Sequence, residues 1–291
     1  MNPPTDLPLL VNGNPVVIDS LELLGGLLVL VGAPIFIVEL ASLYRSGQLT
    51  VRRLGGILTS LFTLLPATAV QVVLGRVLVT LFFAVHALAP WPIPTTWATA
   101  ALALLAVDFV YYWDHRLSHE VNVMWSAYHS VHHSADHFDQ SIAARISFVD
   151  IVSVVLYFPL ALLGLHPLLI LGCYGVVLGW QQWIHTELID RLPMLDGWLN
   201  TPSNHRVHHA RNPEYLDRNY GGILMVWDRL FGTYSAENIP VDYGLVTPQT
   251  SQHPWTVHFF SLKMLVQRLK RSPSLSDVLR VLLGRPADAK R

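Results

Sequence analysis

The sequence predicts an all-α integral membrane protein with about four to five transmembrane helices, and three observations support this prediction. Hydrophobic residues make up 52% of the 291 residues and charged residues only 13%, whereas soluble domains carry about a quarter charged residues. Prolines interrupt the two longest apolar stretches. Backbone polar groups inside a bilayer need partners within the chain, so such stretches must be helical. Four of them contain no charged side chain: residues 23–37, 54–75, 77–107 and 151–186.

The stretches divide into an N-terminal span and two helical hairpins. One span needs about 20 apolar residues to cross about 30 Å of hydrocarbon, so 77–107 and 151–186 are each too long for a single span. Each contains a proline break, APWPIP at 89–94 and LHP at 165–167, and proline ends helices and favours turns. The alternative is a large soluble core of buried helices, but too few polar residues remain to cover one.

The polar segments complete the domain organisation. The tail at 262–271 has apolar residues at helical spacing beside basic ones, which fits a helix on the membrane surface or a solvated helix equally well. We expect four regions: an N-terminal tail (1–22), N-terminal membrane helices (23–113), a histidine-rich region with a membrane hairpin at 148–186 (114–234), and a C-terminal cytosolic tail (235–291).

Charge and cysteine content exclude several function classes. The net charge of −1 gives no general attraction to nucleic acid. One cysteine, Cys173, rules out an internal disulfide and a cysteine-based metal cluster, and its apolar surroundings favour a buried thiol. The sequence also lacks a phosphate-binding Gly-rich loop and a Gly-x-Ser-x-Gly elbow.

Histidines gather just beyond the ends of the membrane stretches. Three boxes read HRLSH, HSVHH and HRVHH, and a single histidine follows in QQWIHTE. Residues three or four apart share a helix face, so each box is a set of aligned imidazoles. Neutral imidazole is the commonest protein ligand for first-row metals. The candidate ligands are His115, His119, His129, His132, His133, His185, His205, His208 and His209.

Nine imidazoles are too many for one tetrahedral ion, and they match two adjacent ions with four or five ligands each. Imidazole suits zinc, copper, nickel and iron alike, so spacing does not name the metal. Histidines outside the boxes fit ordinary hydrogen-bonded roles better, and we place His137, one turn after His133, outside the ligand set. The others are His86, His166, His253 and His258.

The residues around the boxes resemble the fatty acid hydroxylase and sterol desaturase superfamily of membrane di-iron, histidine-box oxygenases. The similarity covers roughly 106–234 and is carried by DFVYYWDHRLSHE, WSAYHSVHHSADHF and WIHTE. Its most specific part is TPSNHRVHHARNPEYLDRNYGGILMVWDRLFGTY, residues 201–234, which looks like the alkylglycerol monooxygenase branch. Asp139 stands where that branch has an Asn, which weakens the transfer of a particular substrate but not of the metal site.

The resemblance implies a cytosolic helical cap that holds a di-metal histidine site. It implies two iron ions that use O2 to hydroxylate or desaturate a C–H bond of a lipid substrate in the bilayer. No haem or flavin domain is evident, so we expect an external electron donor, either a tetrahydropterin or a small redox protein. Ring N–H groups of metal ligands usually donate to a carboxylate or carbonyl. The candidate carboxylates are Asp114, Glu120, Asp150, Glu187 and Asp217.

Other functions stay open at this point. A sterol or fatty-acyl desaturase of the same superfamily would use the same ligands. A non-catalytic metal-binding or metal-transport membrane protein is the alternative from another class, but a transporter places histidines or carboxylates within its spans, and these spans are nearly free of them. Basic residues around the last box place the histidines in the cytoplasm by the positive-inside tendency. We expect a multi-pass protein of a bacterial inner membrane.

Overall fold

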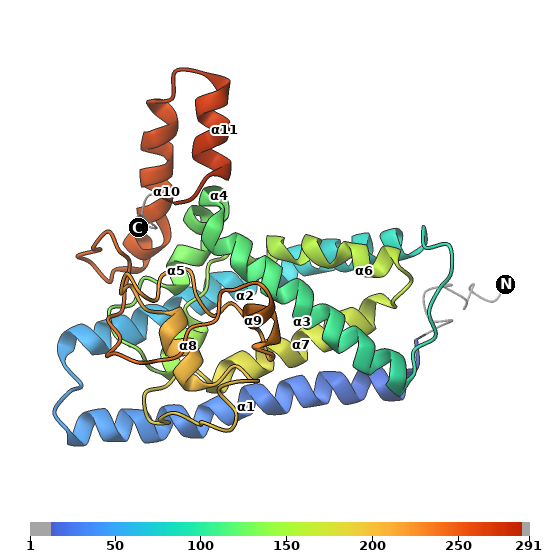
Figure 1. Ribbon diagram of the computed structural model, residues 1–291, viewed down its shortest axis with the longest axis horizontal. Coiled ribbons are helices and arrows are strands. Elements are labelled where there is room, and N and C mark those ends of the chain that lie inside the picture. Colours follow the sequence, from blue (N-terminus) through green and yellow to red (C-terminus); the bar gives the residue numbers. More distant parts are fainter. Residues whose placement is uncertain (1–12, 287–291) are drawn as a thin grey trace.

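A computed structural model describes residues 13–286, and its regular elements there are all helical (Figure 1). Two isolated antiparallel bridges, Leu199 with Leu224 and Ala210 with Tyr243, are the exceptions within this range. The prediction of an all-α protein is therefore confirmed. Residues 1–12 of the expected N-terminal tail lie outside the described residues.

Two long antiparallel helices, α1 (Pro15–Arg45) and α2 (Val51–His86), run the length of the molecule (Figure 1). The side chains of Asn14 and Thr50 cap their first turns by accepting from Val16 N and Arg53 N. At about 1.5 Å per residue, both exceed the thickness of a bilayer core. In the described chain, they are the two helices that are long and apolar enough to cross a membrane.

The expected four to five transmembrane helices are therefore not confirmed. Helix α2 continues through Arg76, whose side chain is exposed, so 54–75 and the first part of 77–107 form one helix. The segment after Phe148 begins with a 3-10 helix, η4 (Asp150–Tyr157), and a short α6 (Phe158–Leu162). Together they are too short for a span.

Both proline-containing segments separate helices. Helix α2 ends at His86, and α3 (Trp97–Glu120) begins after 89–94 with a capping box between Thr96 and Thr99. The LHP segment separates α6 from α7 (Pro167–Trp183). Helix α7 packs closely on α1. Gly179 of α7 leaves no room for a side chain at their contact, since a Cβ there would lie 2.6 Å from the backbone oxygen of Gly25 in α1.

The apolar core lies between α1, α3, α6 and α7 and includes Val17, Val107, Ile170 and the buried thiol of Cys173. Much of the remaining surface of α1 and α2 is apolar but exposed, as at Leu65, which is 68% exposed. Contiguous apolar surface of this kind is rare on soluble monomers and fits contact with lipid chains.

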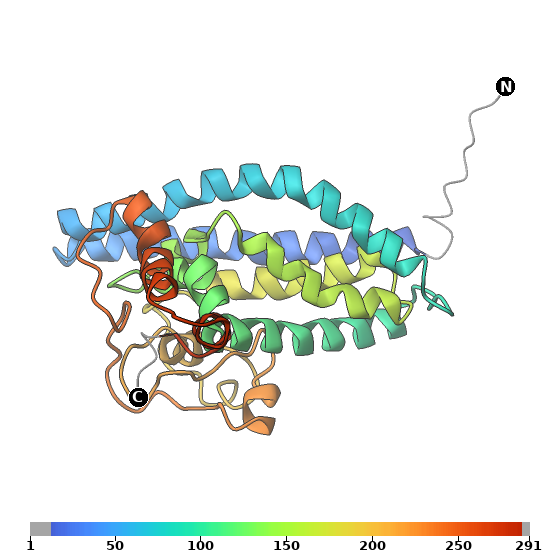
Figure 2. The ribbon, with the colours of Figure 1, turned by 90° about the horizontal axis from the view of Figure 1, so that it is seen from above.

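One end of the bundle carries a cap of short helices and loops, which holds the second and third histidine boxes, while His115 and His119 lie in the last turns of α3. A two-helix hairpin, α10 (Pro254–Lys270) and α11 (Leu275–Leu283), projects from this cap away from the long helices (Figures 1 and 2). The expected C-terminal tail therefore contains two helices. The cap elements are α4 (Asn122–Met124), a π-helical turn η2 (Trp125–His129), α5 (Ser130–His132), η3 (Gln140–Ala144), α8 (Pro202–His208) and α9 (Val226–Leu230).

Candidate metal centre

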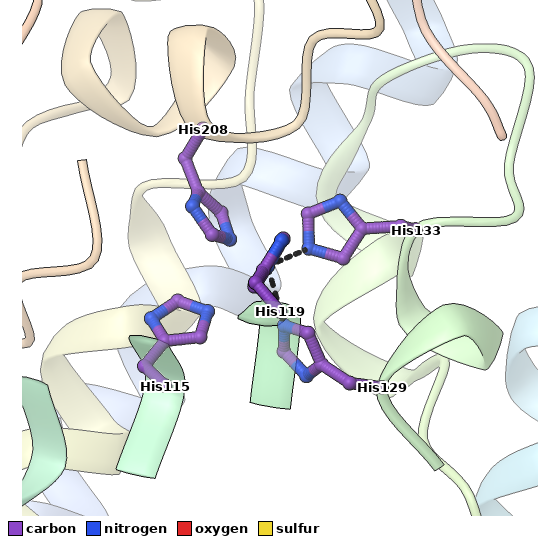
Figure 3. Close-up of side chains that lie close together, drawn as sticks. All are labelled: His115, His119, His129, His133 and His208. Atoms are coloured by element: carbon purple, nitrogen blue, oxygen red, sulfur yellow. Dashed lines mark hydrogen bonds between the residues drawn. The ribbon is translucent and has the colours of Figure 1, made fainter. Parts of the chain in front are cut away.

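The structure brings the nine boxed histidines together into two adjacent groups. The five-histidine cluster consists of His115, His119, His129, His133 and His208, and its rings point toward one another (Figure 3). The four-histidine cluster consists of His132, His185, His205 and His209. Within each cluster, one ligand nitrogen from every ring lies within 4.8 Å of all the others.

Helical spacing decides which histidine joins which cluster. Neighbouring residues on a helix point about 100° apart, whereas residues four apart point nearly the same way. His129 and His133 accordingly share the five-histidine cluster, while His132 between them points into the other. The last box repeats this arrangement, since His205 pairs with His209 and the intervening His208 enters the five-histidine cluster. Each of these two boxes therefore supplies both clusters.

The ring nitrogens approach as closely as ligands of one ion. In the five-histidine cluster, His119 Nε2 lies 2.9 Å from His129 Nε2 and 3.1 Å from His133 Nε2. In the four-histidine cluster, His205 Nε2 lies 2.8 Å from His185 Nε2 and 3.2 Å from His209 Nε2. Two nitrogens each about 2.1 Å from one ion, at a right angle, lie about 3.0 Å apart. The donor set of both clusters therefore fits a metal ion.

Backbone carbonyls face the opposite ring nitrogens. His115 Nδ1 lies 3.0 Å from Tyr220 O, and His208 Nδ1 lies 3.1 Å from Arg218 O. A proton on Nδ1 that donates to a carbonyl leaves the Nε2 lone pair free to face the cluster. His208 Nε2 is buried without a hydrogen-bond partner, which is costly unless an ion occupies the cluster.

Two histidines of the four-histidine cluster make the same kind of contact with a backbone carbonyl. His132 Nδ1 lies 3.2 Å from Arg145 O, and His185 Nδ1 lies 2.7 Å from Gln181 O. These four ring contacts go to backbone carbonyls rather than to the carboxylates suggested by the sequence.

Burial keeps the imidazoles neutral. Desolvation lowers the pKa of His132 to about 4. Desolvation, together with neighbouring imidazoles, holds the pKa values of His133, His205 and His209 well below the ordinary value of 6.5. Nitrogen lone pairs in both clusters are thus available at neutral pH, as metal binding requires.

Sequence comparison with known proteins shows to which family the chain belongs. The sequence model of the fatty acid hydroxylase family matches residues 100–233, which include all nine clustered histidines. Alkylglycerol monooxygenase from Danio rerio is 43% identical over 198 residues, which cover 68% of this chain and 43% of the relative. The Homo sapiens enzyme of that name is 42% identical with the same coverage. The chain belongs to the fatty acid hydroxylase superfamily.

Within the superfamily, the chain is similar to the alkylglycerol monooxygenase branch. An ornithine lipid hydroxylase from Rhizobium tropici is 33% identical over 147 residues, 48% of this chain and 44% of that protein. The chain spans less than half the length of these relatives. No solved structure matches it. The histidine clusters and the family together indicate the use of iron.

In this fatty acid hydroxylase domain, two buried carboxylates hold the loop next to the last box. Asp228 accepts from Tyr220 N at 2.8 Å and from Gly221 N at 2.7 Å, and Tyr220 O in turn lies against His115. Asp108 accepts from Ile223 N at 2.6 Å. Asp228 also accepts from Thr233 Oγ1 at 2.7 Å, so its partners in these contacts are two backbone N–H groups and a hydroxyl. The sequence did not reveal the role of Asp108, because 115 residues separate it from its partner Ile223.

Two arginines brace the cap of the domain. Arg145 is fully buried and donates to Ser134 Oγ at 2.9 Å and to Gln252 Oε1 at 2.7 Å, while its carbonyl faces His132. Arg206, between two histidines of the last box, pairs with Glu237 at 2.7 Å. Both arginines fix backbone segments from which histidines project.

His137 lies outside both clusters of the domain. Its Nδ1 is 3.0 Å from Asp136 Oδ1, and its Nε2 is 3.4 Å from Asp139 Oδ2. Asp139 also lies 3.4 Å from Arg53 Nε of α2. These contacts make His137 part of the contact between the cap and α2.

The clusters lie between a large cavity and a small cleft. The cavity holds about 440 Å³, and apolar side chains such as Phe82, Val154 and Leu178 form much of its wall. On the cap side, a cleft of about 40 Å³ is lined by Arg211 and Asp217 and by histidines of the five-histidine cluster only. The histidines that face the cavity are His115, His129, His132, His185 and His205, and those that face the cleft are His119, His133 and His208.

Proposed function

We propose that the protein is a membrane-bound di-iron oxygenase that uses O2 to hydroxylate a C–H bond of a lipid substrate. The observation that carries this proposal is the position of two all-imidazole clusters at the end of a largely apolar cavity. The names of the relatives, alkylglycerol monooxygenase and ornithine lipid hydroxylase, describe lipid oxygenation. All nine clustered histidines are the proposed ligands.

Iron bound by neutral imidazoles supplies the reduction of O2 and the oxidation of the C–H bond. The chain itself has three tasks. The carbonyls of Tyr220, Arg145, Gln181 and Arg218 fix the ring orientations. The apolar wall of the cavity excludes water and holds the hydrocarbon chain of the substrate. Positioning to within about 1 Å then selects which C–H bond reacts.

Hydroxylation places one oxygen atom of O2 in the product and releases the other as water, so each turnover consumes two electrons and two protons. We propose that an external donor, a tetrahydropterin or a small redox protein, supplies them. The cap-side cleft supports this arrangement, because it reaches His119, His133 and His208, which do not line the apolar cavity.

We also propose that the clusters face the cytoplasm, in a bacterial inner membrane. Basic residues support this orientation. Arg52 and Arg53 at the start of α2 contact Asp136 and Asp139, so the turn between α1 and α2 lies at the same end as the histidines. Arg45 adds a further positive charge at that turn, as the positive-inside tendency requires.

The test is a turnover assay in membranes with O2, a reductant and a panel of alkylglycerols, ornithine lipids and phospholipids. We expect one lipid class to gain one oxygen, detected by mass spectrometry, and His205→Ala membranes to give none. Loss of two hydrogens without an added oxygen would assign desaturation instead. Energy-dependent metal uptake by vesicles without lipid oxidation would assign transport.

Elemental analysis tests the metal centre separately. Anaerobically purified protein should carry about two irons per chain, because the imidazoles form two groups and not one. A single tightly held zinc, with no iron after reconstitution, would contradict the di-iron proposal.

A further inference from the structure

The α10–α11 hairpin stands apart from the rest of the fold. It lies crosswise to α1 and α2 in Figure 1 and is seen nearly end-on in Figure 2. Its base is fixed to the cap, since Asn122 N and Nδ2 donate to Gly284 O at 2.9 Å and to Val281 O at 2.8 Å. Val257 and Leu265 of α10 are buried. A firmly attached hairpin that crosses membrane-length helices lies parallel to the membrane plane.

Each helix of the hairpin has an apolar stripe that the described chain leaves uncovered. On α11, Leu275, Leu279 and Leu283 are 73%, 48% and 63% exposed, and their spacing of four places them on one face. No residue of α11 is buried. On α10, Trp255 and Phe259 are likewise exposed. A solvated hairpin gains nothing from such stripes, whereas an interfacial one does.

The hairpin also differs from the rest of the chain in charge. Residues 254–286 contain six basic residues and one acidic residue, a net charge of +5, whereas the whole chain has −1. Arg280 pairs with Asp277, and Arg285 pairs with Glu120 and Asp217. Among the described residues, no carboxylate lies within salt-bridge distance of the remaining four, which are Lys263, Arg268, Lys270 and Arg271.

We propose that the α10–α11 hairpin docks on the anionic lipid surface of the bilayer that α1 and α2 cross. The apolar stripe of α11 enters the boundary between headgroups and acyl chains, and the unpaired basic side chains bind lipid phosphates. Figure 1 shows α11 displaced from α10 toward the ends of the long helices where α1 begins and α2 ends, with open space beside it. This is the side on which the bilayer lies if the cap is at its surface.

Docking has a consequence for the site. Helix α10 packs on η2, the turn that contains His129, so lipid contact of the hairpin steadies the wall of the five-histidine cluster. The proposal concerns membrane contact and does not depend on the reaction. A failure of either one leaves the other intact.

The experiment uses the full chain in nanodiscs of phosphatidylcholine, with or without phosphatidylglycerol. A Cys173→Ala background carries one new cysteine with an environment-sensitive fluorophore, at Leu279→Cys or at the exposed polar control Gln267→Cys. We expect nitroxide-labelled acyl chains to quench the fluorophore at 279 several-fold more than the one at 267, and aqueous iodide to show the reverse. Leu275→Cys reports on the same stripe if the 279 variant fails to assemble.

The quenching difference should grow with phosphatidylglycerol and should shrink when Lys263, Arg268, Lys270 and Arg271 are all replaced by Gln. A thermal unfolding midpoint equal to that of the Cys173→Ala parent confirms that each variant is folded. Equal access of iodide to positions 279 and 267 in both lipid mixtures would overturn the proposal. So would protection of 279 that requires an added acidic protein, because the stripe would then be a protein-docking surface.

Discussion

The two histidine clusters are built from the same boxes but face different surroundings. The five-histidine cluster borders both the apolar cavity and the cap-side cleft, whereas, of these two, the four-histidine cluster borders only the cavity. The larger cluster therefore reaches both the cavity and the cleft lined by Arg211 and Asp217, and the smaller one reaches the cavity. Two metal sites with the same type of ligand can thus differ in role because different parts of the molecular surface give access to them.

The largest expected effect comes from a ligand of the smaller cluster. His205→Ala removes a ring whose Nε2 lies within 3.2 Å of the Nε2 atoms of both His185 and His209. Three imidazoles then remain in the four-histidine cluster. We expect turnover to fall to background and iron content to fall to about one per chain. His129→Ala leaves four imidazoles in the larger cluster, so we expect it to retain more iron than His205→Ala. Elemental analysis of matched membrane preparations, with His253→Ala as the control, measures the difference. Equal iron loss in both variants would remove the distinction between the clusters.

A smaller effect is expected from the carboxylate that supports one cluster only. Both oxygens of Asp228 accept backbone N–H groups beside Tyr220, and Asn can accept with only one. Asp228→Asn should weaken iron binding at the five-histidine cluster by about 10–100-fold, the usual cost of losing a partner of a ligand. Iron titrations should show the main loss of affinity at one site and a smaller loss at the other. The exposed Asp190→Asn is the control. Equal weakening of both sites would show that the loop supports the whole centre.

Acid should destabilise the metal-free protein over a defined window. The folded-state pKa of His132 is lowered to about 4 from 6.5, and the other clustered pKa values are lowered too. The unfolded chain therefore takes up protons first as the pH falls. The stability that neutral His132 contributes is fully present above pH 6.5 and is lost as the pH falls from 6.5 to about 4, and the loss from the other clustered histidines continues below that. Thermal unfolding of metal-free protein across this range should show a falling midpoint. A flat profile would contradict the burial of both clusters.

The smallest effect is expected at His137, which touches neither cluster. His137→Ala removes contacts with Asp136 and Asp139, which are partly exposed or shared with Arg53. We expect reduced but not lost turnover, with unchanged iron content. Loss of iron from this variant would place His137 in the ligand set and enlarge one of the clusters.

Sequence reasoning found the histidines because their signal is local. Spacing of three and four residues is set by the helix itself. The prolines at 89–94 follow the end of α2, and Pro167 stands at the start of α7, where a missing N–H costs nothing. The continuation of α2 through Arg76 was missed because a lone charge looks like a boundary. In the structure, that side chain is simply exposed on a helix.

The supporting contacts were missed for a different reason. Asp108 and Asp228 are ordinary carboxylates in the sequence, and their roles depend on backbone groups brought close only by folding. The separation of His132 from His133 into different clusters could have been derived from helix geometry. Which cavity each cluster borders could not, because it depends on how α2, α7 and the cap pack together.

Neighbouring histidines in different clusters would link the binding of the two proposed ions. One peptide bond joins His132 to His133, and another joins His208 to His209. An ion held by His132 and His209 therefore also restricts the backbone that carries His133 and His208. A second ion would then lose less conformational entropy on binding, so the di-iron proposal predicts positively cooperative uptake of the two ions. Because such coupling is reciprocal, removing either ion would lower the binding affinity for the other by the same factor.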